Sequence, residues 1–516
     1  MVELQRISDR LPPDCLVRAM LAMILLHHQG NFLANLVLAS QPLRYSLHTQ
    51  CMIICILLGK MSFSGGLIED KSPAKAVSHL RAEKLRHQSA SISPLGKKND
   101  RMADHVSAPI PDAHRVFAHI PTAPDDPILG LTESFRRDPR PQKVNLGVGV
   151  YQDDAGVVPL LGAVRKAEER LISKSLSRSY LAIEGHATFR ERLQRLVFGE
   201  TSTALAEGRI VSAQTIAGSG ALRLGADLLV FANPGATIYI SDPSWANHQA
   251  IFERAGLKVA SYPYFDPATK ALHITAMLET LNHIPEGSIV LLHACCHNPS
   301  GVDPSREQWQ QIADVLASRN AVAFIDMAYQ GFGDGPHEDA YAVRLFAERG
   351  IPLFVSTSCS KNFGLYAERV GLLSFVANDA HTAHRMLTQW KRLIRGNYSS
   401  PPFHGASIVA EILSDQELEA EWISQLAEMR TRIKEQRGLL AAALGGMGLD
   451  SDFSFIVEHR GMFTYTGFTE QVVDRLRDEH GIYMVRSGRM CVAALNNSNI
   501  DYVAESIAAT LRATAR

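Results

Sequence analysis

The stretch RIVSAQTIAGSGALRLGADLLVF, from Arg209 to Phe231, decides the fold. Its first part, Arg209–Ile216, is a short apolar run that predicts a strand ending at a glycine pair, Gly218 and Gly220. Its second part, Ala221–Phe231, has the length and apolar spacing of a helix. A strand that leads through a glycine turn into a helix is the repeating unit of a parallel α/β sheet.

The same alternation continues along the chain. Further apolar runs predict strands at Thr237–Ser241, Ser288–Ala294, Ala321–Asp326 and Pro352–Ser358. Apolar residues recur at helical spacing from Trp309 to Leu316, and Asp303-Pro304 predicts the start of that helix. The strands are nearly continuous apolar runs, which favours a sheet covered by helices on both faces and joined by parallel crossovers. We therefore predict the α/β class.

Composition and charge exclude several functions. The chain has 516 residues, of which 46% are hydrophobic and 20% charged, as in ordinary globular proteins of two or more domains. A net charge of -1 gives no sign of a nucleic-acid or membrane surface. The seven cysteines form neither a disulfide framework nor a paired metal-ligand spacing. We therefore expect a reducing compartment, a cytoplasmic location, no metal, no nucleic acid and no membrane partner.

The first hundred residues differ in character from the rest. The apolar runs Ala19–Leu26 and Cys51–Gly59 are shorter than the roughly 20 residues of a membrane span. Neither a secretory signal nor a transit peptide is clear, and Ser89–Lys98 is polar and turn-rich like a linker. We expect residues 1–101 to be an extension outside the catalytic unit, explained by a start assigned upstream of Met102. A targeting or membrane-tethering extension is the alternative.

Polar and aromatic residues gather at the predicted strand ends, where ligands bind in open α/β sheets. They are Ser219, Trp245, Asn298, Asp326 and the turn Ser358–Lys361. Each has an ordinary explanation: a solvated loop lysine, a turn-capping aspartate, a core tryptophan. Together they suit a cofactor with an aldehyde, a phosphate and an aromatic ring that carries a basic nitrogen. A lysine amine forms a Schiff base with an aldehyde, and a buried carboxylate keeps a ring nitrogen protonated.

The phosphate of such a cofactor needs hydrogen-bond donors. AGSGALRLG supplies free amides where a helix begins, and helix N-termini hold phosphates. Arg369 adds a guanidinium fork, and Ser358 and Ser360 add hydroxyl groups.

From Val116 to the C-terminus the sequence resembles the class I, fold-type I aminotransferases that use pyridoxal 5'-phosphate (PLP), and within them the aspartate and aromatic amino acid subgroup. The resemblance rests on nine blocks in the family order: VNLGVGVYQDDAG, YLAIEGHATFRERLQRLVFG, AGSGALRLGA, DPSWANH, HACCHNPSGVDPS, FIDMAYQGFG, STSCSKNFGLYAERVG, RGNYSSPPFHGA and SGRMCVAALN. It implies a large, mostly parallel sheet domain and a smaller α+β domain. The implied divisions are 102–157 for the N-terminal arm and the first part of the small domain, 158–428 for the large PLP-binding domain, and 429–516 for the rest of the small domain.

The resemblance also implies a role for each matching residue. Lys361 matches the Schiff-base lysine and proton shuttle, Asp326 the partner of the ring nitrogen, and Tyr329 and Asn298 the donors to the phenolic oxygen. Trp245 matches the stacking aromatic, and His248 and His293 match groups near the aspartate. The implied phosphate contacts are Gly218, Ser219, Gly220, Ser358, Ser360, Arg369 and, from the neighbouring subunit, Tyr180. The implied substrate contacts are Gly149, Trp245, Asn298, Arg489 for the α-carboxylate and, across the dimer, Arg395 for a second carboxylate. Ala217 replaces a serine common in relatives.

The implied activity is ping-pong transamination in a homodimer with shared active sites. NYSSPP and GRMCVA are closer to the aromatic members, so we expect tyrosine or phenylalanine, and also aspartate, to react with 2-oxoglutarate. A dedicated aspartate aminotransferase is the alternative. The paired carboxylate arginines argue against a PLP lyase or decarboxylase. A binding protein without activity would be expected to lose Lys361, Asp326 or Arg489, and the chain has all three.

Overall fold

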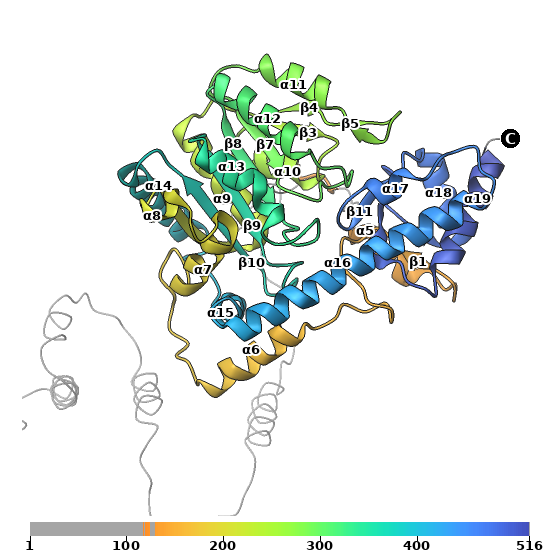
Figure 1. Ribbon diagram of the computed structural model, residues 1–516, viewed down its shortest axis with the longest axis horizontal. Helices are drawn as coiled ribbons and strands as arrows, with labels where there is room; N and C mark the ends of the chain where they lie inside the picture. The colour runs from red at the N-terminus through yellow and green to blue at the C-terminus, as the bar shows by residue number, and fades with distance from the viewer. Residues whose placement is uncertain (1–116, 118, 124–128, 515–516) are drawn as a thin grey trace, which may run out of the picture. The chain divides into compact units, whose positions relative to one another are not determined.

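The structure, a computed structural model, describes residues 117, 119–123 and 129–514 (Figure 1). The predicted extension 1–101 and Met102 lie outside the described residues. The helices are α5 Leu129–Arg137, α6 Gly162–Ser173, α7 Ala187–Phe198, α8 Thr203–Ala206, α9 Ala217–Ala232, α10 Asn247–Ala255, α11 Ile274–Asn282, α12 Arg306–Ser318, α13 Tyr341–Glu348, α14 Ala380–Asn397, α15 His404–Ile412, α16 Gln416–Gly445, α17 Phe455–Glu458, α18 Glu470–His480 and α19 Ile500–Thr514. Among these, none combines the length and the apolar character needed to cross a membrane.

Seven of the strands form one sheet in the order β2-β10-β9-β8-β7-β3-β4. They are β2 Ile210–Ile216, β3 Thr237–Asp242, β4 Lys258–Pro263, β7 Ile289–His293, β8 Val322–Met327, β9 Leu353–Ser358 and β10 Val370–Val376. The five predicted strands are confirmed to within one residue at each end. All strands of this sheet run parallel except β10, which is antiparallel to both β2 and β9. The α/β class is therefore confirmed, with one reversed strand that the sequence did not reveal.

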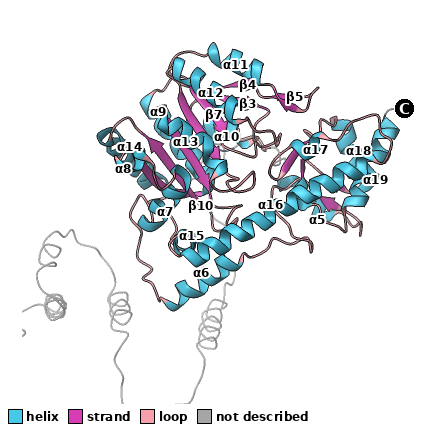
Figure 2. Cartoon of the chain, viewed as in Figure 1, coloured by secondary structure: helices cyan, strands magenta, loops and turns pink. Residues whose placement is uncertain are grey.

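Both faces of the sheet are covered, as the continuous apolar runs predict (Figure 2). In β7 the side chains alternate between two separate cores. Val290 and Leu292 pack in the core that contains Trp309 of α12. Ile289 and Leu291 pack in the core that contains Trp390 of α14. A strand buried on both faces has no polar side, which explains the absence of alternation in its sequence.

Two predicted helix starts need correction. α9 begins at Ala217 rather than Ala221, so the glycine pair lies inside its first turn instead of in a separate loop. α12 begins at Arg306, after Ser305, whose hydroxyl accepts from Gln308 N in a capping box. Asp303 does not start this helix, because its carboxylate accepts hydrogen bonds from the amides of Cys296 and His297 in the preceding loop.

The long helix α16 connects two regions of the molecule. It packs beside α6 and α15 at one end and beside α17 and α19 at the other (Figure 1). A third core follows it from Leu418 to Leu444 and continues into the C-terminal region. That region contains the short strands β1 Val144–Asn145, β11 Phe463–Tyr465, β12 Ile482–Tyr483 and β13 Arg489–Cys491, and β5 Phe265–Asp266 pairs with β6 Ala271–Leu272 elsewhere. The predicted division at 428/429 therefore falls within one continuous helix.

Candidate active site

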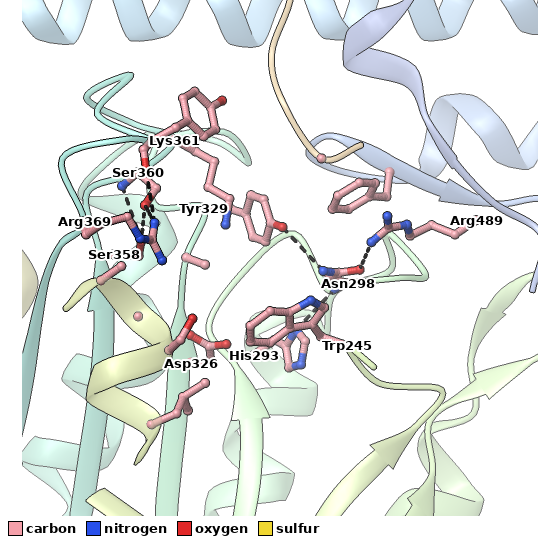
Figure 3. Close-up of a pocket in the computed structure, with 18 residues that line it drawn as sticks. Trp245, His293, Asn298, Asp326, Tyr329, Ser358, Ser360, Lys361, Arg369 and Arg489 are labelled. Atoms are coloured by element: carbon pink, nitrogen blue, oxygen red, sulfur yellow. Dashed lines mark hydrogen bonds between the residues drawn. The ribbon is translucent and has the colours of Figure 1, made fainter. Parts of the chain in front are cut away.

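A cavity of about 210 Å³ lies at the carboxyl edge of the sheet (Figure 3). The residues named from the sequence that line it are Gly149, Ala217, Gly218, Ser219, Trp245, His293, Asn298, Asp326, Tyr329, Ser358, Ser360, Lys361, Arg369 and Arg489. They come from the ends of β7, β8 and β9, the start of α9, the loops after β3 and before β10, and the segments around β1 and β13. The fold thus brings together residues that are up to 340 positions apart, from Gly149 to Arg489.

Lys361 extends into the cavity from the turn after β9. Its Nζ lies 4.6 Å from the centre of the Tyr329 ring. Burial lowers the pKa of the Lys361 amine to about 8, and the positive charges of Arg369 and Arg489 act in the same direction, against Asp326. About a tenth of the amine is therefore neutral and nucleophilic at pH 7, far more than for a lysine with an ordinary pKa.

Asp326 lies in β8, at the floor of the cavity. Burial acts to raise the pKa of its carboxyl group, but the hydrogen bond from His248 and the nearby positive groups outweigh burial and hold the pKa below its usual value. Ser356 Oγ also donates to Oδ1 over 3.4 Å. Burial lowers the pKa of the adjacent His293 to about 3, so that imidazole is neutral at pH 7. Asp326 is therefore an anion at the floor of a cavity that also holds the cationic groups of Lys361, Arg369 and Arg489.

Anion-binding groups gather on one side of the cavity. Ser358 Oγ donates to Ser360 Oγ over 3.1 Å, and Arg369 donates to the same Ser360 oxygen over 3.4 Å. The N-terminus of α9 faces them, and no side chain of the described chain caps it. A Cβ atom on Gly218 would lie 3.2 Å from Cβ of Ser358, so a larger residue would narrow this space. Hydroxyls, a guanidinium and free amides together form a phosphate-binding set.

A hydrogen-bonded chain of side chains lines the opposite side. Arg489 donates to Asn298 Oδ1 over 3.1 Å and to the Gly147 carbonyl over 2.6 Å. Asn298 Nδ2 in turn donates to the Tyr329 hydroxyl over 3.4 Å. Arg489 is buried, and its Nε has no partner among the described residues. Burial lowers the pKa of Arg489. A buried guanidinium with an unused donor is suited to a carboxylate.

Three predicted residues do not line the cavity. Gly220 lies in the first turn of α9, behind Gly218. Tyr180 is 94% exposed. Arg395 is an exposed residue of the last turn of α14, where its guanidinium donates to Ser399 Oγ. The roles of Tyr180 and Arg395 were expected in a neighbouring subunit, and a single chain does not test them.

Four lining residues were not expected from the sequence: Leu222, Ala328, Tyr366 and Phe463. Leu222 and Tyr366 belong to blocks that carry the resemblance, so their positions were available there. Phe463 lies in β11, and its ring packs so closely on Gly149 that a Cβ atom there would lie 2.6 Å from Cζ. This explains a glycine at position 149. No pattern in the sequence indicates that contact, because 313 residues separate the two positions.

Among the described residues outside the cavity, one group is close enough to share a metal ion: Cys295, Cys296 and Asp339. Asp339 already accepts hydrogen bonds from the amides of Gly331, Gly333 and Asp334. The hydrogen bond with Cys296, together with burial, raises the pKa of the Cys295 thiol, and burial raises the pKa of Cys296 to about 11 against the effect of that hydrogen bond. A metal binds the thiolate, which these shifts disfavour. We assign no metal to this group, and the absence of a metal stays a prediction.

The cavity residues fit the expected cofactor. Asp326 offers a fixed negative charge, Asn298 and Tyr329 offer polar groups, the α9 side offers phosphate donors, and Lys361 offers an amine between them (Figure 3). His293 Nε2 and Arg489 Nε are buried atoms without hydrogen-bond partners in the described chain. Both can therefore form hydrogen bonds with a bound molecule. Fold and site together define an enzyme that works with a phosphorylated aromatic aldehyde.

The comparisons with known proteins agree. The family model "Aminotransferase class I and II" matches residues 141–507, and the chain belongs to this family. It is 51% identical to the aspartate aminotransferase of Pseudomonas aeruginosa over 396 residues, which cover 77% of this chain and 100% of that protein. It is 46% identical to the aromatic-amino-acid aminotransferase of Escherichia coli over 397 residues, with the same coverage of 77% and 100%.

Among solved structures, the chain is similar to an aromatic-amino-acid aminotransferase from Burkholderia pseudomallei that is covalently bound to pyridoxal phosphate. The two chains share 52% identity with a TM-score of 0.75, over 77% of this chain and 99% of that one. The protein is therefore a PLP-dependent aminotransferase of the aspartate and aromatic subgroup with the fold-type I architecture. Its cofactor is PLP.

Proposed function

We propose that this aminotransferase transfers the amino group of tyrosine or phenylalanine, and also of aspartate, to 2-oxoglutarate by a ping-pong mechanism. The observation that carries the proposal is the buried Arg489, held by Asn298 beside the amine-bearing Lys361 in one cavity. Aromatic side chains, among them Trp245, Tyr366 and Phe463, line the same cavity and favour an aromatic substrate as well.

The proposed roles follow from the positions of the side chains. Bound PLP supplies an electron-accepting ring. Asp326 would keep the ring nitrogen of bound PLP protonated, with His248 holding the carboxylate in place. Asn298 and Tyr329 would hold the phenolic oxygen, and Trp245 would hold the ring. Ser358, Ser360, Arg369 and the amides of the Gly218–Gly220 turn would hold the phosphate.

Two residues contact the substrate and move its proton in this proposal. Arg489 binds the α-carboxylate through two parallel hydrogen bonds, which fixes the orientation of the α-carbon. Lys361 Nζ, neutral above a pH of about 8 and partly neutral below it, accepts the α-proton as a general base. It then returns the proton as a general acid.

We also propose a homodimer in which Tyr180 and Arg395 complete the site of the second subunit. Both side chains are exposed and lie outside the cavity of their own chain. Ile172 and Leu176, close to Tyr180 in sequence, are exposed apolar residues that a subunit contact would bury. Arg395 would then bind the second carboxylate of aspartate, glutamate or 2-oxoglutarate.

The predicted divisions at 102–157, 158–428 and 429–516 are likewise proposals, as is a cytoplasmic location. The described cysteines are free thiols, which supports a reducing compartment.

A dedicated aspartate aminotransferase is the second candidate. It is favoured by the 51% identity to the Pseudomonas aeruginosa aspartate aminotransferase, which is close to the 52% identity to the aromatic enzyme from Burkholderia pseudomallei. The deciding experiment measures kcat/KM for tyrosine, phenylalanine and aspartate with 2-oxoglutarate. Aromatic values comparable to the aspartate value support our proposal. Negligible turnover of both aromatic substrates would establish the second candidate.

A further inference from the structure

Arg437 is a fully buried arginine in the middle of α16, with 1% of its surface exposed. Among the described residues no salt bridge reaches it, although the charge of Asp303 acts on it from a greater distance. Its guanidinium instead donates to four backbone carbonyls of one short segment: Ile456 over 3.0 Å, Arg460 over 3.3 Å, Gly461 over 2.8 Å, and Phe463. Burying a charge without a counterion is costly. These hydrogen bonds fix the segment from Ile456 to Phe463 against α16.

The held segment ends in the active site. Phe463 begins β11, which pairs antiparallel with β13, the strand that begins at Arg489. The Arg489 guanidinium lies over the Phe463 ring, 4.4 Å from its centre. The same ring meets the Tyr329 ring edge-on at 5.8 Å and packs on Gly149. Phe463 therefore contacts two groups that the proposed function uses, Arg489 and Tyr329, and also the cavity-lining Gly149.

From these contacts we infer that Arg437 is a positioning residue for substrate binding: by holding the Phe463 backbone it fixes the orientation in which Arg489 receives the α-carboxylate. The inference rests on the proposed role of Arg489. It assigns a function to a residue that does not line the cavity. Arginine suits this position because two nitrogens reach the carbonyls from one planar group: Nη1 donates to Ile456, and the two hydrogens of Nη2 are shared among Arg460, Gly461 and Phe463. Nε has no partner among the described residues. The ammonium of lysine carries its three donors on a single atom.

The test uses the PLP-loaded enzyme with Arg437→Lys, and Arg319→Lys as matched control. Arg319 also donates two hydrogen bonds to a backbone carbonyl, that of Ile284, but lies outside the site. The probe is 3-phenylpropionate, a carboxylate without an amine that can bind but not react, and its Kd is read from the cofactor absorbance. KM and kcat for phenylalanine, PLP content and melting temperature are measured alongside.

For Arg437→Lys we expect Kd and KM to rise by about tenfold, the effect of weakening one charge-assisted hydrogen bond. We expect kcat to change much less and the PLP content to stay unchanged, because the phosphate and Lys361 contacts do not involve this segment. Arg319→Lys should leave Kd and KM unchanged. A purely structural role would lower the melting temperature and leave Kd and KM of the folded enzyme unchanged, and that result overturns the inference.

Two further variants keep the inference testable. If Arg437→Lys yields no folded enzyme, Phe463→Leu decides, because the ring is the contact through which Arg437 acts on Arg489. An unchanged Kd in Phe463→Leu overturns the inference. Arg489→Lys is measured in parallel. An unchanged Kd there contradicts the proposed function itself, whereas a raised Kd in Arg489→Lys with an unchanged Kd in Arg437→Lys contradicts the positioning role alone.

Discussion

His248 Nε2 lies 3.0 Å from Oδ2 of Asp326, and Nδ1 of the same ring lies 2.9 Å from Ser244 Oγ. Both His248 and Asp326 are buried. The Ser244 hydroxyl thus holds one nitrogen of the imidazole, and the other nitrogen holds the Asp326 carboxylate. The orientation of Asp326 therefore depends on His248, which does not line the cavity.

The first prediction distinguishes the effect of the Asp326 carboxylate from the effect of the His248 hydrogen bond. Asp326→Asn should lower the single-turnover rate with aspartate by at least about a hundredfold, because losing one partner of a buried charge pair costs about 3–5 kcal/mol and about 1.36 kcal/mol is a factor of ten. His248→Asn should cost about tenfold or less, since the carboxylate itself remains. Equal losses in both variants would mean that the hydrogen bond matters more than the charge.

The second prediction concerns Lys361. Lys361→Ala should abolish steady turnover while PLP stays bound, because Ser358, Ser360, Arg369 and Asp326 do not depend on the amine. PLP content after gel filtration and the turnover rate are the measurements. Turnover close to that of the unchanged enzyme would remove the central assignment.

The third prediction is a pH dependence. The pKa of Lys361 is lowered to about 8 in the folded enzyme without cofactor, so the amine is protonated below that pH and neutral above it. The rate of covalent PLP capture should therefore rise with pH, with a midpoint near 8. Arg489→Gln should move the midpoint upward, since a positive charge that lowers the pKa is lost, whereas Arg489→Lys should keep it. The range from pH 6 to pH 9 extends about two pH units below and about one above this pKa. A capture rate that does not change over this range would contradict the assignment.

The fourth prediction concerns Arg395. Arg395→Ala should lower kcat/KM for aspartate by at least about a hundredfold, since an unpaired buried carboxylate costs more than the roughly 1.5–3 kcal/mol of a charge-assisted hydrogen bond. Phenylalanine should lose far less in its own half-reaction, measured by single turnover. Equal losses for both substrates would show that Arg395 does not sort them by their second carboxylate.

The shared site gives a separate test with the same residue. Mixing inactive Lys361→Ala and Arg395→Ala chains should form hybrid dimers in which one of the two sites has both its own lysine and its neighbour's arginine. Dicarboxylate activity should then partly return. Hybrids that form and regain no activity would count against Arg395 acting across the dimer.

The fifth prediction concerns the extension. A chain that begins at Met102 should be folded, dimeric and fully active, because the family model starts at residue 141 and relatives matched over their whole length cover 77% of this chain. Light scattering and kcat/KM compare it with the full chain. A shortened chain that fails to fold would show that residues 1–101 are structural.

The sequence predicts those parts of the fold that depend on local pattern. The strands around Leu291 and Ile325 are apolar up to His293 and Asp326 at their carboxyl ends, and burial on both faces explains why. The direction of β10 could not be predicted, since an apolar strand has the same pattern whichever way it runs. Asp303 illustrates a different limit: an Asp-Pro pair favours a helix start, but here tertiary hydrogen bonds use the carboxylate elsewhere.

For the site, too, local sequence patterns predict some residues and miss those that depend on tertiary contacts. Most of the predicted residues that line the cavity occur in the blocks that carry the resemblance, although Leu222 and Tyr366 of the same blocks were not predicted. Phe463 and Arg437 were not predicted. Phe463 acts through packing, and Arg437 acts through backbone carbonyls, which every residue has, so neither contact leaves a pattern in the sequence. Such contacts become visible only once the chain is folded.

The reversed strand β10 has a consequence for how the enzyme would lose its cofactor. The eleven residues Cys359–Arg369 leave the sheet at Ser358 and return to it at Val370, and Cys359 N donates to the Val370 carbonyl over 3.0 Å at the base of this loop. The loop carries Ser360, Lys361 and Arg369, so one local opening removes the amine and part of the phosphate set together. Amide hydrogen exchange in this loop should therefore slow markedly when PLP binds. Exchange in α12, which packs in the core that contains Trp309 and does not line the cavity, should stay the same.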